Sequence, residues 1–203
     1  MIVPTSQVST NGLLSFGQPH TPTSSGGFNF SAIPSPPIIA PFWDDINVEI
    51  GGTIYYRQES DTFIVEQLQQ AISSQYPEAK FLHPPLVFLA TWDRVEPFNN
   101  VFRGLVNTFQ VIIVSDGTQT FVRFNYGDIQ WGGSSTLIGV SAGDQHNFIT
   151  HPASLSSSVL MIDNTTVTYQ TECKFFNLWL CLQFSCSHKT RSGVKELSPC
   201  SLV

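Results

Sequence analysis

The chain has 203 residues, a length that favours one domain with tails over two domains. Charged residues make up only 12% of the sequence and the formal net charge is −6, without a cluster of lysine or arginine before the last few residues. The sequence therefore offers no basic surface for nucleic acid or anionic lipid, and its polar, turn-rich composition is typical of β-rich extracellular modules.

The first part of the chain alternates strand signals with turn residues. Residues 11–17, NGLLSFG, predict a short strand, and residues 18–38 predict a loop because they are rich in Pro, Ser, Gly and Thr without periodicity. After Gly51, the sequence GTIYYRQ is rich in β-formers and predicts a second strand that follows a turn.

Two adjacent carboxylates lie between these segments, at Asp44 and Asp45. We predict that they shape a turn after a buried Phe42-Trp43 pair, by accepting hydrogen bonds from backbone N–H groups near Asn47. A calcium cage needs six or more oxygens, and no EF-hand spacing of acids follows the pair. Glycoside hydrolysis needs two carboxylates that face each other across a substrate, which neighbours in sequence do not provide.

One helix is expected in the body of the chain, near residues 61–76. Asp61 is a suitable N-cap, and Pro77 stands where a helix must have ended. The apolar residues of the segment recur at helical spacing: Ile64, Leu68, Ala71 and Ile72.

The other periodic segments of the body predict strands. Residues 107–126 predict a hairpin whose arms are joined at Asp116-Gly117. Further short strands are predicted at residues 85–95, 135–143 and 157–167. The expected fold class is therefore mainly β (α+β), an antiparallel two-layer β domain with the single amphipathic helix described above.

The tail from about residue 168 differs in character from the body. It holds all four cysteines of the chain, and their spacing lacks the paired knuckles of zinc sites: Cys173, Cys181, Cys186 and Cys200. Its apolar stretch is only about half the ~20 residues of a membrane span. We expect a folded domain at 1–167 and a divergent, Cys-containing tail at 168–203, either a final strand with a disordered end or sequence that belongs to no fold.

Several motifs, in the same order along the chain, closely resemble the NIDO domain family, the extracellular module of nidogen, alpha-tectorin and the membrane mucin type. The likeness runs from about Asn11 to Val167. The most specific positions are Phe42, Trp43, Asp45, Trp92, Asp93, Phe109, Phe121, Asn125 and Tyr126. The resemblance implies a non-enzymatic domain of extracellular matrix or cell-surface proteins that takes part in cell–matrix adhesion.

Other functions find less support in the sequence. Trp43, Trp92 and Trp131 are flanked by strand residues, which favours core positions over a sugar-stacking platform. The histidines lie beside Pro or in polar loops, without a Gly-x-Ser-x-Gly or His-Glu-x-x-His motif. We predict no catalytic residue, no cofactor and no metal site. A carbohydrate-binding β-sandwich is the alternative function, and a hydrolase is a distant third.

We therefore expect an adhesion or matrix-scaffolding module whose partners are matrix or cell-surface proteins, bound at strand edges or at the 18–38 loop. The first residues show no export signal, so the protein is either cytosolic or an internal piece of a longer chain. The resemblance implies the second, as part of a longer secreted or membrane-anchored protein. Asn29 and Asn164 each begin an Asn-x-Ser/Thr triplet, and at least one is expected to be glycosylated after export.

Overall fold

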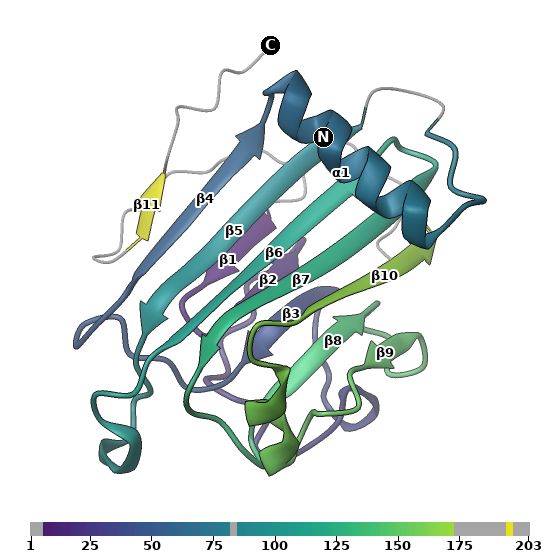
Figure 1. Ribbon diagram of the computed structural model, residues 1–203. Coiled ribbons are helices and arrows are strands. Elements are labelled where there is room, and N and C mark those ends of the chain that lie inside the picture. Colours follow the sequence, from purple (N-terminus) through teal and green to yellow (C-terminus); the bar gives the residue numbers. More distant parts are fainter. Residues whose placement is uncertain (1–5, 82–84, 173–193, 197–203) are drawn as a thin grey trace.

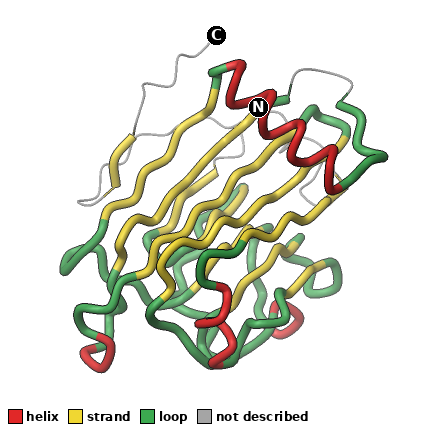
Figure 2. The backbone as a smooth tube through the Cα atoms, in the orientation of Figure 1, coloured by secondary structure: helices red, strands yellow, loops and turns green. Residues whose placement is uncertain are grey.

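The computed structural model describes residues 6–81, 85–172 and 194–196 of the chain. In this part of the protein two β-sheets pack face to face, and one α-helix crosses the outer side of the larger sheet (Figure 1, Figure 2). The expected fold class, a mainly antiparallel two-layer β domain with one helix, is confirmed.

The smaller sheet has five antiparallel strands in the order β1-β2-β3-β8-β9. They are β1 (Ser6–Ser9), β2 (Leu13–Phe16), β3 (Ile38–Trp43), β8 (Leu137–Ser141) and β9 (Phe148–Thr150). The larger sheet has six strands in the order β10-β7-β6-β5-β4-β11, and only β11 pairs in parallel. They are β4 (Thr53–Glu59), β5 (Leu86–Val95), β6 (Asn107–Ser115), β7 (Gln119–Ile129), β10 (Thr166–Glu172) and β11 (Val194–Glu196).

The hairpin of β6 and β7 forms as its sequence predicts. Asp116 accepts hydrogen bonds through Oδ1 from the backbone N–H groups of Thr118 and Gln119, each at 2.9 Å. Gly117 has φ +86°, a left-handed conformation that strains residues with a Cβ. The Asp-Gly pair therefore fixes the turn and, through it, the register of β6 and β7.

Aromatic side chains fill the space between the two sheets. The Trp92 and Phe109 rings stack at 5.1 Å between centroids, and Phe42 contacts Phe109 at 5.3 Å and Trp131 at 5.5 Å. Trp43 and Trp92 have no exposed surface and Trp131 keeps 2%. The core interpretation of these tryptophans is confirmed, and a sugar-stacking platform built on them is wrong because no ring face reaches solvent.

Helix α1 (Thr62–Gln75) matches the predicted helix within a residue at each end. Its N-cap is Asp61, whose carboxylate accepts a hydrogen bond from the Phe63 N–H at 2.9 Å. The helix packs on the outer face of the six-stranded sheet, above Val87, Leu89, Ile112, Val114 and Phe121. This second apolar layer covers one half of that face and leaves the other half to polar residues.

The outer face of the five-stranded sheet is covered by a loop instead of a helix. Residues 18–37, hereafter the cover loop, hold Phe30 against a third apolar cluster that includes Leu13, Ile38 and Trp43. Gly139 permits this contact, because a Cβ there would lie 2.0 Å from the Ile149 carbonyl oxygen and 3.0 Å from the Phe30 ring. The predicted loop is confirmed, ending where β3 begins.

The segment 157–167, predicted as one strand, is a 3-10 helix, η3 (Ser157–Ile162), followed by a turn and the start of β10. The strand prediction is wrong here because the buried side chains, Val159 and Ile162, recur after three residues, whereas Leu160 and Met161 point to solvent. The Ser156 hydroxyl begins η3 by accepting a hydrogen bond from the Ser158 N–H.

Four strands were not expected from the sequence: β1, β3, β9 and β11. Strand β3 escapes periodicity because it is buried on both faces and contains a bulge between Ala40 and Trp43, so its residues do not alternate. Strand β10 also runs to Glu172, beyond the expected end of the strands near Val167. Predictions for the cysteines and for the apolar stretch 175–184 lie outside the described residues.

Little free strand edge remains on either described sheet. In the smaller sheet the outer strands β1 and β9 are short, and in the larger one β11 lies along β4. At the β10 edge, the Tyr76 hydroxyl donates to the Thr168 carbonyl oxygen at 2.7 Å. Tyr76 therefore occupies a backbone carbonyl that another strand would pair with.

We predict that Tyr76→Phe lowers the free energy of unfolding by about 1 kcal/mol, because it removes this hydroxyl and keeps the ring on Phe121. Urea denaturation and size-exclusion chromatography measure the loss and any self-association through the β10 edge. Tyr55→Phe is the control, since the Tyr55 hydroxyl bonds to no described residue. Equal urea denaturation midpoints for wild type and Tyr76→Phe would show that the hydroxyl does not stabilise the β10 edge.

Candidate functional site

The buried carboxylate of Asp44 ties the end of β3 to a loop far along the chain. It accepts hydrogen bonds from the Ser135 hydroxyl at 3.0 Å, from the Thr136 hydroxyl at 2.5 Å and from the Asp45 N–H at 2.9 Å. A buried carboxylate is tolerated only when its oxygens are satisfied, and three donors do so here. The Asp44 carboxylate therefore has one local turn partner of the predicted kind, the Asp45 N–H, whereas its other two donors are hydroxyl groups that precede β8. The prediction is wrong for the Asp45 carboxylate.

Asp45 contributes mainly through its backbone. Its carbonyl oxygen accepts a hydrogen bond from the Phe98 N–H at 2.8 Å, whereas its carboxylate accepts none from the described residues. Burial, followed by the neighbouring Asp44 carboxylate, raises the pKa of the Asp45 side chain. Within residues 6–81, 85–172 and 194–196, no group of three His, Cys, Asp or Glu side chains surrounds a possible metal position.

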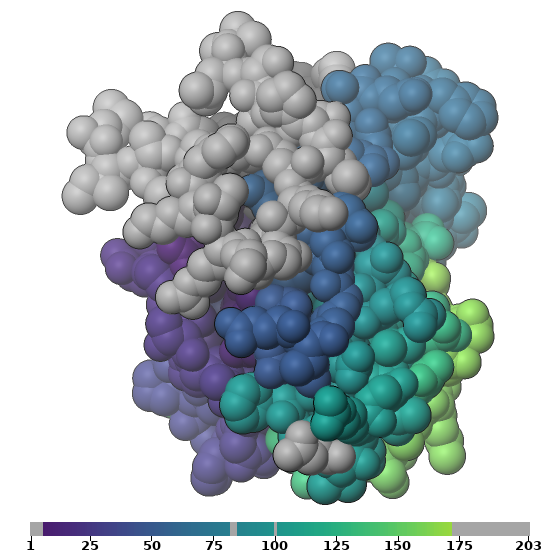
Figure 3. Space-filling model, turned by 90° about the vertical axis from the view of Figure 1, so that its left-hand side faces the viewer, coloured from purple at the N-terminus to yellow at the C-terminus, as the bar shows by residue number. Residues whose placement is uncertain are grey.

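Two loops at this end of the domain expose a cluster of large apolar side chains. Phe98 is 63% exposed, Val101 84%, Ile50 51% and Leu105 37%. We call these four residues the end-loop surface. In Figure 3 the dark blue segment near residue 50 and the teal segment near residue 100 lie side by side in the lower part of the face. Apolar side chains so exposed on a folded domain mark contact sites for other molecules.

Hydrogen bonds hold these two loops in place. The Asn47 N–H donates to the Glu96 carbonyl oxygen at 3.0 Å, and the Gly104 N–H donates to a Glu96 carboxylate oxygen at 3.0 Å. The Asn99 side chain accepts from the N–H groups of Val101 and Phe102 and so begins a 3-10 helix, η2 (Asn100–Phe102). The exposed side chains are therefore carried by an ordered backbone, which lowers the entropy cost of binding.

A second surface lies on the half of the six-stranded sheet that α1 leaves open. A row of cross-strand neighbours there consists of Tyr55, Thr91, Gln110, Asn125 and Thr166. Gln110 donates to the Thr91 hydroxyl at 2.8 Å, and Asn125 donates to the Gln110 side-chain oxygen at 3.0 Å. Because these polar groups bond to one another across the strands, the row stabilises the sheet before it offers donors to a ligand.

The motif residues of the sequence do not meet in one surface site. Phe42, Trp92, Phe109 and Tyr126 lie in the central core, Trp43 under the cover loop and Phe121 under α1. The Tyr126 hydroxyl donates to the Pro41 carbonyl oxygen at 2.9 Å, and burial raises its pKa well above the ordinary value. Asn125 belongs to the polar row, and Asp93 is half-buried near the end of β5. These positions are explained by folding, whereas the end-loop surface lies elsewhere.

Two functional features were missed in the sequence. The end-loop surface had a signal, since Phe98, Val101 and Leu105 are apolar residues in a segment between strands that has no strand or helix periodicity. Asn107 had none. Its fully buried side chain donates to the Trp131 carbonyl oxygen at 2.9 Å and accepts from the Gln130 and Trp131 N–H groups. It thereby closes the β6–β7 ladder beneath the end loops.

The two glycosylation candidates differ in geometry. Asn164 is exposed in the turn before β10 and has φ +53°. The Asn29 side chain is half-buried, and its oxygen accepts from the Phe30 N–H at 2.6 Å and from the Thr150 hydroxyl at 2.8 Å. An oligosaccharyltransferase needs an accessible amide, so Asn164 is the better acceptor of the two.

Fold and surfaces together define the class of protein: a two-sheet β domain that exposes an ordered apolar loop surface. The family model of the nidogen-like domain (NIDO) matches residues 4–175, and the chain belongs to this family. No described helix has the length and apolar character needed to cross a membrane.

The chain matches several curated proteins, and in each it spans only a small part of that protein's length. The chain is 32% identical over 176 residues to alpha-tectorin of Mus musculus, covering 78% of this chain and 8% of that protein. It is 29% identical over 154 residues to dendrite extension defective protein 1 of Caenorhabditis elegans, covering 74% and 13%. It is 30% identical over 126 residues to nidogen-1 of Mus musculus, covering 59% and 10%. No solved structure matches the chain.

We predict that Asp44→Ala lowers the free energy of unfolding by about 2–4 kcal/mol, because it leaves three hydrogen-bond donors at a buried site without their acceptor. Asp45→Ala should change it by no more than about 0.5 kcal/mol, since the side chain has no described partner. Thermal melts with calcium and with chelator test the metal alternative. A calcium-dependent gain in wild type that disappears in Asp45→Ala would contradict the structural role of the pair.

We predict that, after secretion behind a supplied signal peptide, Asn164 carries a glycan and Asn29 carries less or none. Intact mass before and after glycosidase treatment measures the modification. Thr166→Ala should abolish most of the shift and Ser31→Ala should leave it, because each removes the hydroxyl position of one triplet. The reverse pattern would show that burial does not decide between the two sites.

Proposed function

We propose that this domain is a non-enzymatic adhesion and scaffolding module of an extracellular matrix or cell-surface protein. It binds a protein partner through the end-loop surface. The observation that carries the proposal is the exposure of Phe98 and Val101 on a loop whose backbone is fixed by hydrogen bonds. Membership of the nidogen-like family supports the extracellular setting, since the family occurs in matrix proteins such as nidogen and tectorin.

The end-loop surface has the properties of a binding hot spot. Phe98 supplies a large rigid ring, and Val101 and Leu105 extend the apolar area beside it. Because Glu96 holds both loops through its carbonyl and its carboxylate, the side chains need little ordering on contact. Exposed aromatic anchors on an ordered backbone contribute a large share of the free energy of binding in protein interfaces.

The structure gives less support to strand edges as the contact. The β10 edge is occupied by Tyr76, and β1 and β9 are too short to pair with a long partner strand. A partner is therefore better accommodated by loops at the end of the sheets than by strand addition along their sides.

The carbohydrate-binding alternative has a weaker basis. Three of the four tryptophans are buried in the core, and the amides of Gln110 and Asn125 already bond within the polar row. A glycan on this face would have to replace those hydrogen bonds or use the donors left over. The alternative predicts binding that depends on Asn125, whereas the proposed function predicts dependence on Phe98.

The test uses the secreted domain and a surface coated with solubilised extracellular matrix. We predict that Phe98→Ser combined with Val101→Ser weakens binding at least tenfold, about 1.4 kcal/mol, with little effect on the melting temperature. Met161→Ser is the matched control, because Met161 is 82% exposed on η3, outside the end-loop surface.

Equal binding by wild type and the double variant would overturn the assignment of the surface. Loss of binding after enzymatic deglycosylation of the coat, together with loss in Asn125→Ala, would favour carbohydrate recognition instead. A catalytic role is tested by incubating the domain with the same coat and looking for new fragments by mass spectrometry.

A further inference from the structure

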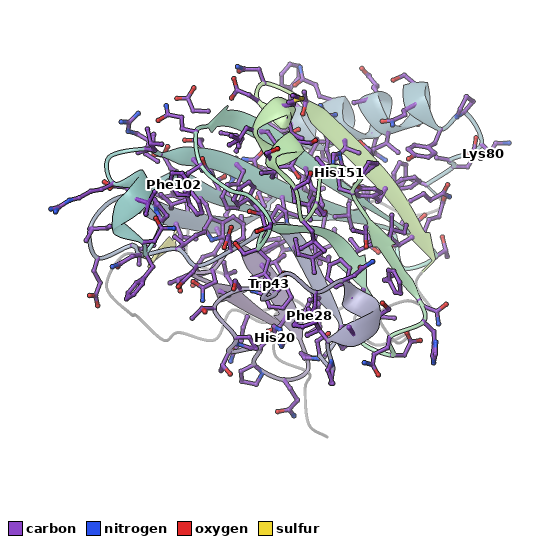
Figure 4. All side chains as sticks on the ribbon, turned by 90° about the horizontal axis from the view of Figure 1, so that it is seen from below. His20, Phe28, Trp43, Lys80, Phe102 and His151 are labelled. Atoms are coloured by element: carbon purple, nitrogen blue, oxygen red, sulfur yellow. The ribbon has the colours of Figure 1, made fainter. Side chains whose placement is uncertain are left out.

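His20 is buried in the cover loop against an aromatic ring. Its side chain packs edge-on to Trp43, with ring centroids 4.9 Å apart and an interplanar angle of 74°. Only 9% of the residue is exposed, and its Nε2 atom has no hydrogen-bond partner in the structure. Figure 4 shows His20 and Trp43 side by side at the lower end of the molecule, with Phe28 nearby. An orphaned polar atom in a buried ring requires an explanation.

Among the described residues, almost no charge surrounds His20. All five strands of the smaller sheet lack Asp, Glu, Lys and Arg, and the cover loop has no charged side chain. Two acids, Asp44 and Asp45, follow Trp43. The Asp44 carboxylate accepts hydrogen bonds from the hydroxyl groups of Ser135 and Thr136. Burial lowers the pKa of His20, and no neighbouring charge acts on it. A proton added at Nε2 would therefore have no counter-ion and no acceptor among the described residues.

Two contacts fasten the first part of the cover loop. The Trp43 indole N–H donates to the Pro22 carbonyl oxygen at 3.3 Å, and the Ser25 hydroxyl donates to the Ser135 carbonyl oxygen at 2.8 Å. The later part is held separately, by the buried Phe30 ring and the Asn29–Thr150 hydrogen bond. Opening of residues 18–24 would thus uncover Trp43 without dislodging Phe30.

We propose that His20 is a pH-sensitive latch, and that its protonation releases residues 18–24 from Trp43 and exposes the Trp43 side chain on the outer face of the five-stranded sheet. The closed form requires a neutral ring, whereas the open form accepts the proton at the ordinary pKa of about 6.5. The latch is fully effective above that pH and weakens as the pH falls below it. Between neutral pH and pH 5.0 the ratio of open to closed molecules rises at most about thirtyfold, because protonation of the open form can add no more than this.

His151 has to be separated from this effect. It is half-buried beyond β9, burial lowers its pKa, and its Nδ1 atom accepts a hydrogen bond from the Ala153 N–H at 3.1 Å. Acid therefore weakens this contact as well, but His151 touches neither Trp43 nor the first part of the cover loop in any described contact. A readout at the Trp43 indole distinguishes the two histidines.

The experiment follows the exchange of tryptophan indole N–H groups with solvent by NMR at pH 7.5 and pH 5.0, corrected for the intrinsic effect of pH on exchange. The Trp43 signal is assigned by its loss in Trp43→Phe. We expect its exchange to accelerate several-fold and up to about thirtyfold in acid. The Trp92 indole, which donates to the Ser9 carbonyl oxygen at 3.1 Å, is the internal reference and should not respond.

His20→Phe keeps a ring on Trp43 and cannot be protonated, so it should abolish the acid response, whereas His151→Gln should keep it. An unchanged Trp43 exchange rate in wild type, or an equal acid response in His20→Phe, would overturn the latch. Should His20→Phe fail to fold, titration of the His20 ring in wild type decides. The proposal requires it to titrate below 6.5 together with the Trp43 signal, and an ordinary or higher value would contradict it.

Discussion

The fold depends on the way in which β3 distributes two adjacent aromatic residues. A bulge between Ala40 and Trp43 sends Phe42 into the space between the sheets and Trp43 to the opposite face. Phe42 then packs on Phe109 and Trp131, which joins the small sheet to the large one, while Trp43 supports the cover loop. Asp44 fixes the same strand end to the loop before β8, so one irregular strand positions both apolar layers.

Local chemistry decided which elements could be predicted from the sequence. The Asp61 cap with its helical spacing and the Asp116-Gly117 turn are signals contained within a few residues, and both elements form where expected. Strand β3 and helix η3 were missed because their patterns depend on what packs against them. Ile38 and Ile39 are buried on opposite sides, and Val159 and Ile162 are buried three residues apart, so neither segment alternates.

The candidate site was less accessible to sequence reasoning than the core. The conspicuous residues Trp43, Trp92, Trp131 and Asp44 hold the fold together, because aromatic and hydrogen-bonding groups are also what a β domain needs for packing. The exposure of Phe98 and the burial of His20 depend on how distant loops fold over the sheets. No spacing rule encodes either property, since each follows from the tertiary arrangement.

The Tyr76 hydroxyl links the C-terminal end of α1 to the edge of β10, so the two parts of the domain open together. It belongs to the residue that ends α1, yet it donates a hydrogen bond to a backbone carbonyl of β10. Fraying of the last helical turn therefore also bares a strand edge, although the rest of the fold stays intact. Any association through β10 is therefore expected to require local detachment of the helix end and not global unfolding, so conditions that stabilise the helix should also slow it.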